Sequence, residues 1–73
     1  MITMETRQNL SERLKKLRIE RNLSKTQLAN AIEISARTIT NRELGSKNMR
    51  MKHILRLTRF FCVSVDYLLG LTD

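Results

Sequence analysis

Four side chains between residues 36 and 41 combine small, polar and cationic groups at helical spacing. They would share the outer face of one short helix: Ala36, Arg37, Thr40 and Asn41. An arginine can make two hydrogen bonds to the edge of guanine, and an asparagine can make two to the edge of adenine. The pattern therefore favours a helix that reads bases in the major groove of DNA, although an ordinary solvated helix face can have the same composition.

The segment that must position this face, residues 23–43, has the pattern of two short helices in succession. Ser24 can cap the first helix by accepting a hydrogen bond from an early backbone N–H, and Gln27 can complete a capping box. Ser35 can cap the second helix, and Ser64 can cap a later one, in the same way. Because each cap contributes about 1 kcal/mol, the sequence predicts that one helix stops and another starts within this segment.

We expect these two helices at residues 25–32 and 36–44, with only Glu33 and Ile34 between them. A connection this short forces a large angle between the helices, as in a helix-turn-helix. The apolar residues of the segment fit one shared buried face: Leu28, Ala29, Ile32, Ile34 and Ile39. If the turn requires a positive φ at Glu33, the backbone there is strained by about 1 kcal/mol. Otherwise the second helix is tilted.

The chain resembles the Cro/cI-type (XRE) family of helix-turn-helix phage repressors from about residue 10 to residue 70. The motifs that carry the resemblance are Arg18, LS at 23–24, LA at 28–29, IS at 34–35, TI at 38–39, ELG at 43–45 and VSVDYLLG at 63–70. Each motif is weak alone, but the set is specific. The resemblance implies an all-α fold, namely a compact five-helix lambda-repressor-like DNA-binding domain with the helix-turn-helix at its second and third helices.

The sequence departs from the family pattern at several places. Glu33 occupies the turn, where the family favours glycine, and Cys62 stands where glycine is frequent. Arg42 replaces an apolar or aromatic residue, so its stem can pack while its guanidinium reaches a phosphate. Met49 stands where proline is common, which predicts a less rigid loop before the fourth helix.

The composition favours a polyanionic partner. Fourteen Lys and Arg residues against seven Asp and Glu residues give the 73-residue chain a net charge of +7 and a pI near 10.6. Such an excess of positive charge suits DNA, RNA or an anionic membrane surface. No apolar run approaches the roughly 18 residues of a membrane span, and no signal peptide is visible, so we expect a cytoplasmic protein.

Apolar spacing predicts the remaining helices. A first helix over about residues 7–21 would bury one stripe: Leu10, Leu14 and Leu17. A flexible tail would precede it at 1–6, and a single helix-turn-helix domain would occupy 7–73. A helix over 51–61 has core-like residues, namely Met51, Ile54, Leu55 and Leu57, with Thr58 and Phe61 near them. Its cations are expected to be solvated: Lys52, Arg56 and Arg59. The last helix would run over 65–69.

Six residues are candidates for contacts with the DNA backbone: Lys25, Gln27, Arg42, Lys47, Asn48 and Arg50. Lys25 would stand at a helix N-terminus, where free N–H groups and the positive end of the helix dipole already favour a phosphate. The resemblance implies that the loop containing residues 47–50 lies along the DNA backbone. An ordinary solvated surface is the alternative for each of these residues.

The resemblance also implies an ion pair and a dimer. Arg18 would pair with Glu43 after the recognition helix, and a partly buried pair of this kind mainly fixes geometry. In the family the C-terminal region often supports a two-fold dimer. Four residues could form that contact, or could equally well close the core instead: Val65, Tyr67, Leu69 and Leu71.

The sequence contains no constellation that indicates catalysis, a metal or a cofactor. His53 is the only histidine and Cys62 the only cysteine, and the chain has no glycine-rich phosphate loop. We expect His53 to be a surface residue and Cys62 to be a structural thiol. The chain is therefore expected not to be an enzyme and to have no cofactor.

These observations lead to one leading function and two alternatives. We expect a sequence-specific regulator of transcription that binds double-stranded DNA, represses, and acts as a homodimer on a pseudo-palindromic operator. An antitoxin or restriction-system controller with a protein partner is the first alternative. A protein-interaction module without specific DNA binding is the second.

Overall fold

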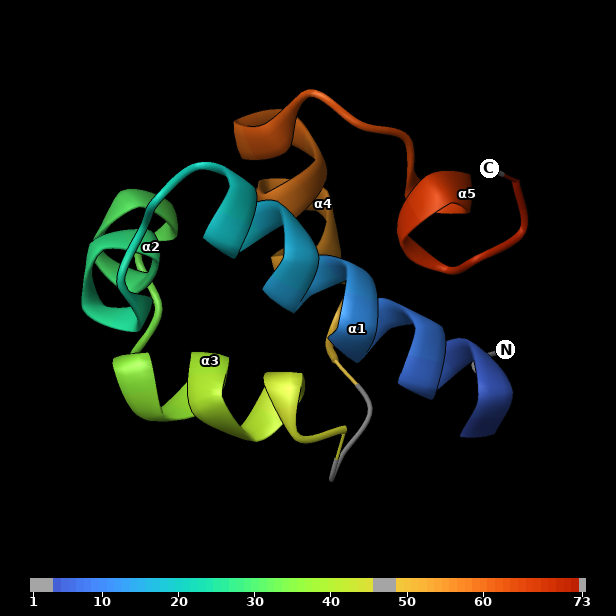
Figure 1. Ribbon diagram of the computed structural model, residues 1–73, viewed down its shortest axis with the longest axis horizontal. Coiled ribbons are helices and arrows are strands. Elements are labelled where there is room, and N and C mark those ends of the chain that lie inside the picture. The colour runs from blue at the N-terminus through green and yellow to red at the C-terminus, as the bar shows by residue number, and fades with distance from the viewer. Residues whose placement is uncertain (1–3, 46–48, 73) are drawn as a thin grey trace.

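The computed structural model describes residues 4–45 and 49–72, which form five α-helices and no strand. In chain order the helices are α1 (Met4–Glu20), α2 (Lys25–Ile32), α3 (Ala36–Glu43), α4 (Met51–Phe61) and α5 (Val65–Leu68). Figure 1 shows α1 crossing the middle of the molecule, with α2 to the left, α3 below and α5 to the right. The predicted all-α, five-helix fold is confirmed.

The helix boundaries agree closely with the predicted ones except at the start of the chain. α2 and α4 begin and end as predicted, and α3 and α5 each end one residue earlier, at Glu43 and Leu68. α1 begins at Met4, so residues 4–6 belong to this helix and not to a flexible tail. Glu5 in the first turn of α1 suits the positive end of the helix dipole, which supports the earlier start.

Local side-chain chemistry sets where the short helices start and stop. The side chains of three N-cap serines each accept a hydrogen bond from the backbone N–H three residues on: Ser24, Ser35 and Ser64. Three residues that are not glycine take left-handed backbone conformations after helices: Asn22, Glu33 and Cys62. At Glu33 φ is 61°, so the turn has the strained geometry, at a cost of about 1 kcal/mol.

All five helices contribute to one hydrophobic core. Its buried residues are Leu10, Leu14, Leu17, Leu28, Ala29, Ile32, Ile39, Met49, Ile54, Leu57, Phe61 and Leu68. The predicted leucine stripe on α1 is therefore confirmed. Three partly buried residues that precede N-cap serines pack against the same cluster: Leu23, Ile34 and Val63.

On α4 the buried stripe differs from the predicted one. The buried residues follow spacings of three and four: Ile54, Leu57, Thr58 and Phe61. Met51 and Leu55, which were predicted to be core, are 53% and 41% exposed. At 100° per residue, Met51 lies about 70° and Leu55 about 110° around the helix axis from the centre of the buried stripe. Met49, predicted to lie in a less rigid loop, is 3% exposed and belongs to the core.

Candidate nucleic-acid interface

The N-terminus of α2 is fixed by a complete capping box. The backbone N–H of Gln27 donates to Ser24 Oγ at 3.0 Å, and the backbone N–H of Ser24 donates to Gln27 Oε1 at 2.8 Å. The side-chain oxygen of Gln27 is thus occupied by the cap, which leaves its amide NH₂ group to donate to a ligand. Lys25 is exposed in the same turn, beside backbone N–H groups that suit an anion.

The outer face of α3 carries the four predicted base-reading residues. At 100° per residue, residues 36, 37, 40 and 41 fall within an arc of about 140°. Ile39 lies outside this arc and is fully buried. Arg37 is exposed, whereas Ala36, Thr40 and Asn41 are partly buried. Thr40 Oγ1 donates to Ala36 O at 3.2 Å, so this hydroxyl is left mainly as an acceptor.

The far end of α3 is tied to α1 by a two-bond ion pair. Arg18 Nε donates to Glu43 Oε2 at 2.6 Å, and Arg18 Nη2 donates to Glu43 Oε1 at 3.1 Å. A third bond joins Arg18 Nη1 to Leu23 O at 2.8 Å. The hydrogen bond that Arg18 donates to Glu43 raises the pKa of Arg18 above its ordinary value, although partial burial opposes that shift. One guanidinium therefore links α1, the start of the α2 segment and the end of α3.

A second group of cations gathers where α3 leads into α4. Arg42 and Arg50 are close enough to His53 to lower its pKa, as are Lys52 and Arg56. Arg50 is exposed, and Arg42 is partly buried with an Nε that has no hydrogen-bond partner among the described residues. Two further predicted phosphate contacts, Lys47 and Asn48, lie outside the described residues. The structure thus brings Arg42 and Arg50 into one positive region beside the end of α3.

His53 is more enclosed than a plain surface residue. Its side chain is partly buried, and Nδ1 is covered with no hydrogen-bond partner among the described residues. Desolvation is the largest cause of the lowering of the His53 pKa, followed by repulsion from the surrounding cations. The neutral form of His53 is therefore favoured. His53 lies at the surface as expected, but its ring is partly covered.

Comparison with known proteins agrees with this geometry. The helix-turn-helix family model matches residues 14–68 of the chain. The chain belongs to the XRE-type helix-turn-helix family. It is 40% identical over 62 residues to YobD of Bacillus subtilis (strain 168), described as an uncharacterised HTH-type transcriptional regulator. The match covers 85% of this chain and 55% of YobD, so the chain spans about half the length of that relative.

Within this helix-turn-helix family member, the C-terminal residues mostly face inward. Val65, Tyr67 and Leu69 pack against the core, as one of the two predicted alternatives requires, whereas Leu71 is 65% exposed. Among the helices of the described residues, none could span a lipid bilayer.

Arg13 holds this C-terminal segment in a way that sequence reasoning missed. Arg13 Nη1 donates to Tyr67 O at 2.6 Å and to Thr72 O at 2.9 Å. Its guanidinium carbon also lies 4.5 Å from the centroid of the Tyr67 ring, a cation–π arrangement. Arg13 and Tyr67 are 54 positions apart, so no local pattern in the sequence marks the pair.

Proposed function

We propose that the chain is a sequence-specific repressor of transcription that reads the major groove of double-stranded DNA with α3. Arg37 and Asn41 provide most of the base discrimination, Ala36 contacts a thymine methyl group, and Thr40 accepts from a base or lies against the backbone. Phosphate contacts by Lys25, the Gln27 amide, Arg42 and Arg50, with Lys47 and Asn48, supply most of the affinity and set the register.

The observation that carries this proposal is the exposed Arg37 on a helix fixed at both ends. Ser35 caps the start of α3 through a 3.1 Å bond from the Thr38 N–H. The Arg18–Glu43 pair fixes the far end of α3. Base recognition depends on a side chain that arrives at a defined position and angle, so a rigid α3 makes Arg37 suited to specificity beyond simple attraction to DNA.

We further propose that two copies bind one pseudo-palindromic operator. Two recognition helices must lie about 34 Å apart to enter successive major grooves on one side of the duplex. Of the four residues considered for the two-fold contact, Leu71 is the most exposed and is the most available to a second copy.

The deciding experiment is a selection from random duplex DNA at fixed, near-physiological salt. A repressor of this kind enriches a palindromic sequence that it binds at least roughly a thousandfold better than random duplex. Salt-sensitive binding with no enriched sequence would contradict the proposal.

Two variants then separate base contacts from phosphate contacts. Arg37→Ala should lower affinity for the selected operator roughly tenfold or more, with little change for random duplex. Lys25→Ala should weaken binding to both DNAs and reduce the slope of log K against log salt by roughly 1. If Arg37→Ala leaves discrimination between the two DNAs unchanged, Arg37 does not read a base.

A further inference from the structure

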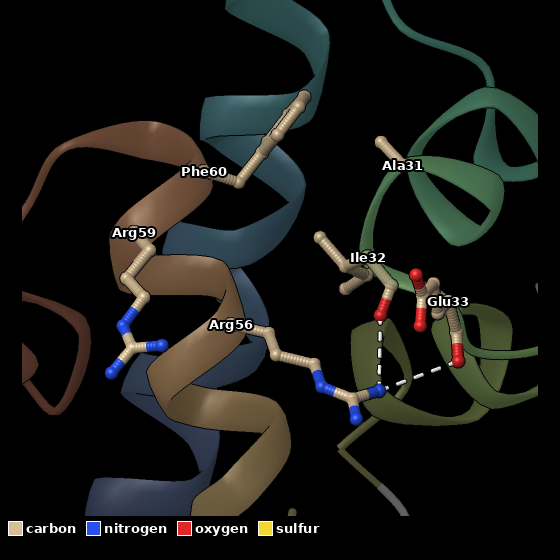
Figure 2. Close-up of a pocket in the computed structure, with 6 residues that line it drawn as sticks. All are labelled: Ala31, Ile32, Glu33, Arg56, Arg59 and Phe60. Carbon is tan, nitrogen blue, oxygen red and sulfur yellow. Dashed lines mark hydrogen bonds between the residues drawn. The ribbon is translucent and has the colours of Figure 1, made fainter.

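A pocket lies between the C-terminal end of α2 and the outer side of α4. Its volume is about 380 Å³, and it is lined by Ala31, Ile32, Glu33, Arg56, Arg59 and Phe60. Figure 2 shows Ala31 and Ile32 on one wall and Phe60 on the other, with Arg56 reaching across the gap below them. The walls are therefore mainly apolar, and the crossing arginine forms one end of the pocket.

Arg56 has a structural role at this pocket. Its Nη1 donates to Ile32 O at 3.2 Å and to Glu33 O at 3.4 Å. Ile32 is the last residue of α2, and Glu33 is the strained residue that follows it. These bonds hold α4 against α2 and keep the two walls at a fixed separation. The pocket is thus preformed, which lowers the entropic cost of filling it.

The solvent-facing side of α4 next to the pocket is cationic. At 100° per residue, Lys52, Arg56 and Arg59 fall within an arc of about 60°, and α4 contains no acidic residue. Lys52 and Arg59 are exposed, and among the described residues their charged side-chain groups have no hydrogen-bond or ion-pair partner. Figure 2 shows the Arg59 guanidinium on the side of α4 that points away from α2. Leu55 and Met51 border this stripe as exposed apolar residues.

The two ends of this surface lie differently with respect to the proposed DNA-binding face. Lys52 and Arg56 adjoin Arg42 and Arg50 around His53, whereas Arg59 lies in the last turn of α4. α4 starts beside the end of α3 and runs to the opposite side of the molecule, where Phe61 O accepts a bond from Arg21 Nη2 at the end of α1 (Figure 1). Along α2, Ile32 lies about 10 Å from Lys25 at a rise of 1.5 Å per residue. A ligand in the pocket can therefore be present while α3 contacts DNA.

We propose that the α2–α4 pocket and the cationic stripe Lys52–Arg56–Arg59 together bind an acidic segment of another protein. An apolar side chain of that segment fills the gap between Ala31 and Phe60, and its carboxylates meet Lys52 and Arg59. Such a surface combines an apolar anchor site with complementary charge, which gives both affinity and orientation. Binding of this acidic segment would bring its protein to the DNA-bound chain.

Two other occupants fit the surface less well. A DNA backbone would satisfy the cations but would gain nothing from the apolar walls. A second copy of this chain would bring like charges together, because a two-fold contact through α4 places Lys52 and Arg59 against the same residues. The whole chain has a net charge of +7, which adds to that repulsion.

The test is a selection from a random 16-residue peptide library displayed on phage, with the full chain bound to its selected DNA as bait. The expected winners are acidic peptides with at least one large apolar residue. They should bind Arg59→Glu and Ala31→Arg at least tenfold more weakly than the parent chain. Lys16→Glu, an equal charge change at an exposed site on α1, should alter peptide binding by less than twofold.

Arg59→Glu and Ala31→Arg change exposed positions, so both should keep the helical circular dichroism and the melting temperature of the parent. The proposal is overturned by an absence of winners, by winners without carboxylates, or by winners that bind both variants as well as the parent. It is also overturned if Arg59→Glu weakens operator binding as much as Lys25→Ala does, because the stripe would then be part of the DNA contact.

Discussion

α3 buries one residue, Ile39, whereas α4 buries four. The two helices are therefore held in place by different kinds of contact. α4 is held by apolar contacts along its length, so its position follows from burial. α3 is held by the buried Ile39 and the partly buried Ala36, so the Ser35 cap and the Arg18–Glu43 pair make a larger contribution to its orientation. The comparison indicates that polar contacts contribute more to the orientation of α3, while apolar contacts on α4 supply much of the stability.

The largest expected effect is on stability, from shortening a buried side chain of α4. Leu57 is fully buried, and Leu57→Ala should lower the free energy of unfolding by about 3 kcal/mol through lost transfer energy and a cavity. Urea denaturation measures this change. A loss below about 1 kcal/mol would contradict the view that α4 is held by burial; Leu55→Ala, at an exposed position on the same helix, is the matched control.

The next effect comes from breaking the polar contact that aims α3. Glu43→Ala leaves Arg18 partly buried without its carboxylate, and should lower the free energy of unfolding by about 1–3 kcal/mol. It should also reduce discrimination between operator and random duplex, since α3 loses its fixed end. A thermodynamic cycle of Arg18→Leu, Glu43→Leu and the double variant measures the coupling between the two side chains. The double variant should lose less stability than the sum of the two single Leu variants. Simple additivity would mean that the two side chains act independently.

A smaller, opposite effect is expected at the turn that joins α2 to α3. Glu33 has a φ of 61°, which glycine adopts without the steric cost of a Cβ. Glu33→Gly should therefore raise the free energy of unfolding by about 0.5–1 kcal/mol, observable as a higher urea midpoint. A lower midpoint would show that contacts of the Glu33 side chain outweigh the backbone strain.

The smallest effect concerns His53, next to the cations that join α3 to α4. Its pKa is lowered in the folded chain by desolvation and then by the surrounding cations. The unfolded state, with a His pKa of about 6.5, consequently binds a proton that the folded state does not. Stability should therefore decrease as the pH falls from about 7.5 towards 5. His53→Gln should flatten the dependence of the free energy of unfolding on pH in this range, measured by urea denaturation at several pH values. An unchanged dependence would mean that other groups cause it.

Much of the local structure was predictable because each of its determinants lies within a few residues. The Ser24 and Ser35 caps are contacts between residues three apart, and they mark the starts of α2 and α3. The buried stripe of α1 follows from the spacing of its leucines. On α4 the same reasoning chose Met51 and Leu55 wrongly, because a helix with apolar residues over a wide arc does not reveal which part of the arc meets the core.

The sequence by itself determined the helices, their caps and the residues on the outer face of α3, since these depend on contacts at spacings of three and four. The tertiary structure decided what depends on residues far apart in the chain. It brought Arg13 to Tyr67 and Arg56 to the end of α2, and it enclosed His53 among cations. The α2–α4 pocket belongs to this second group, because its two walls come from helices whose relative position only the packed core fixes.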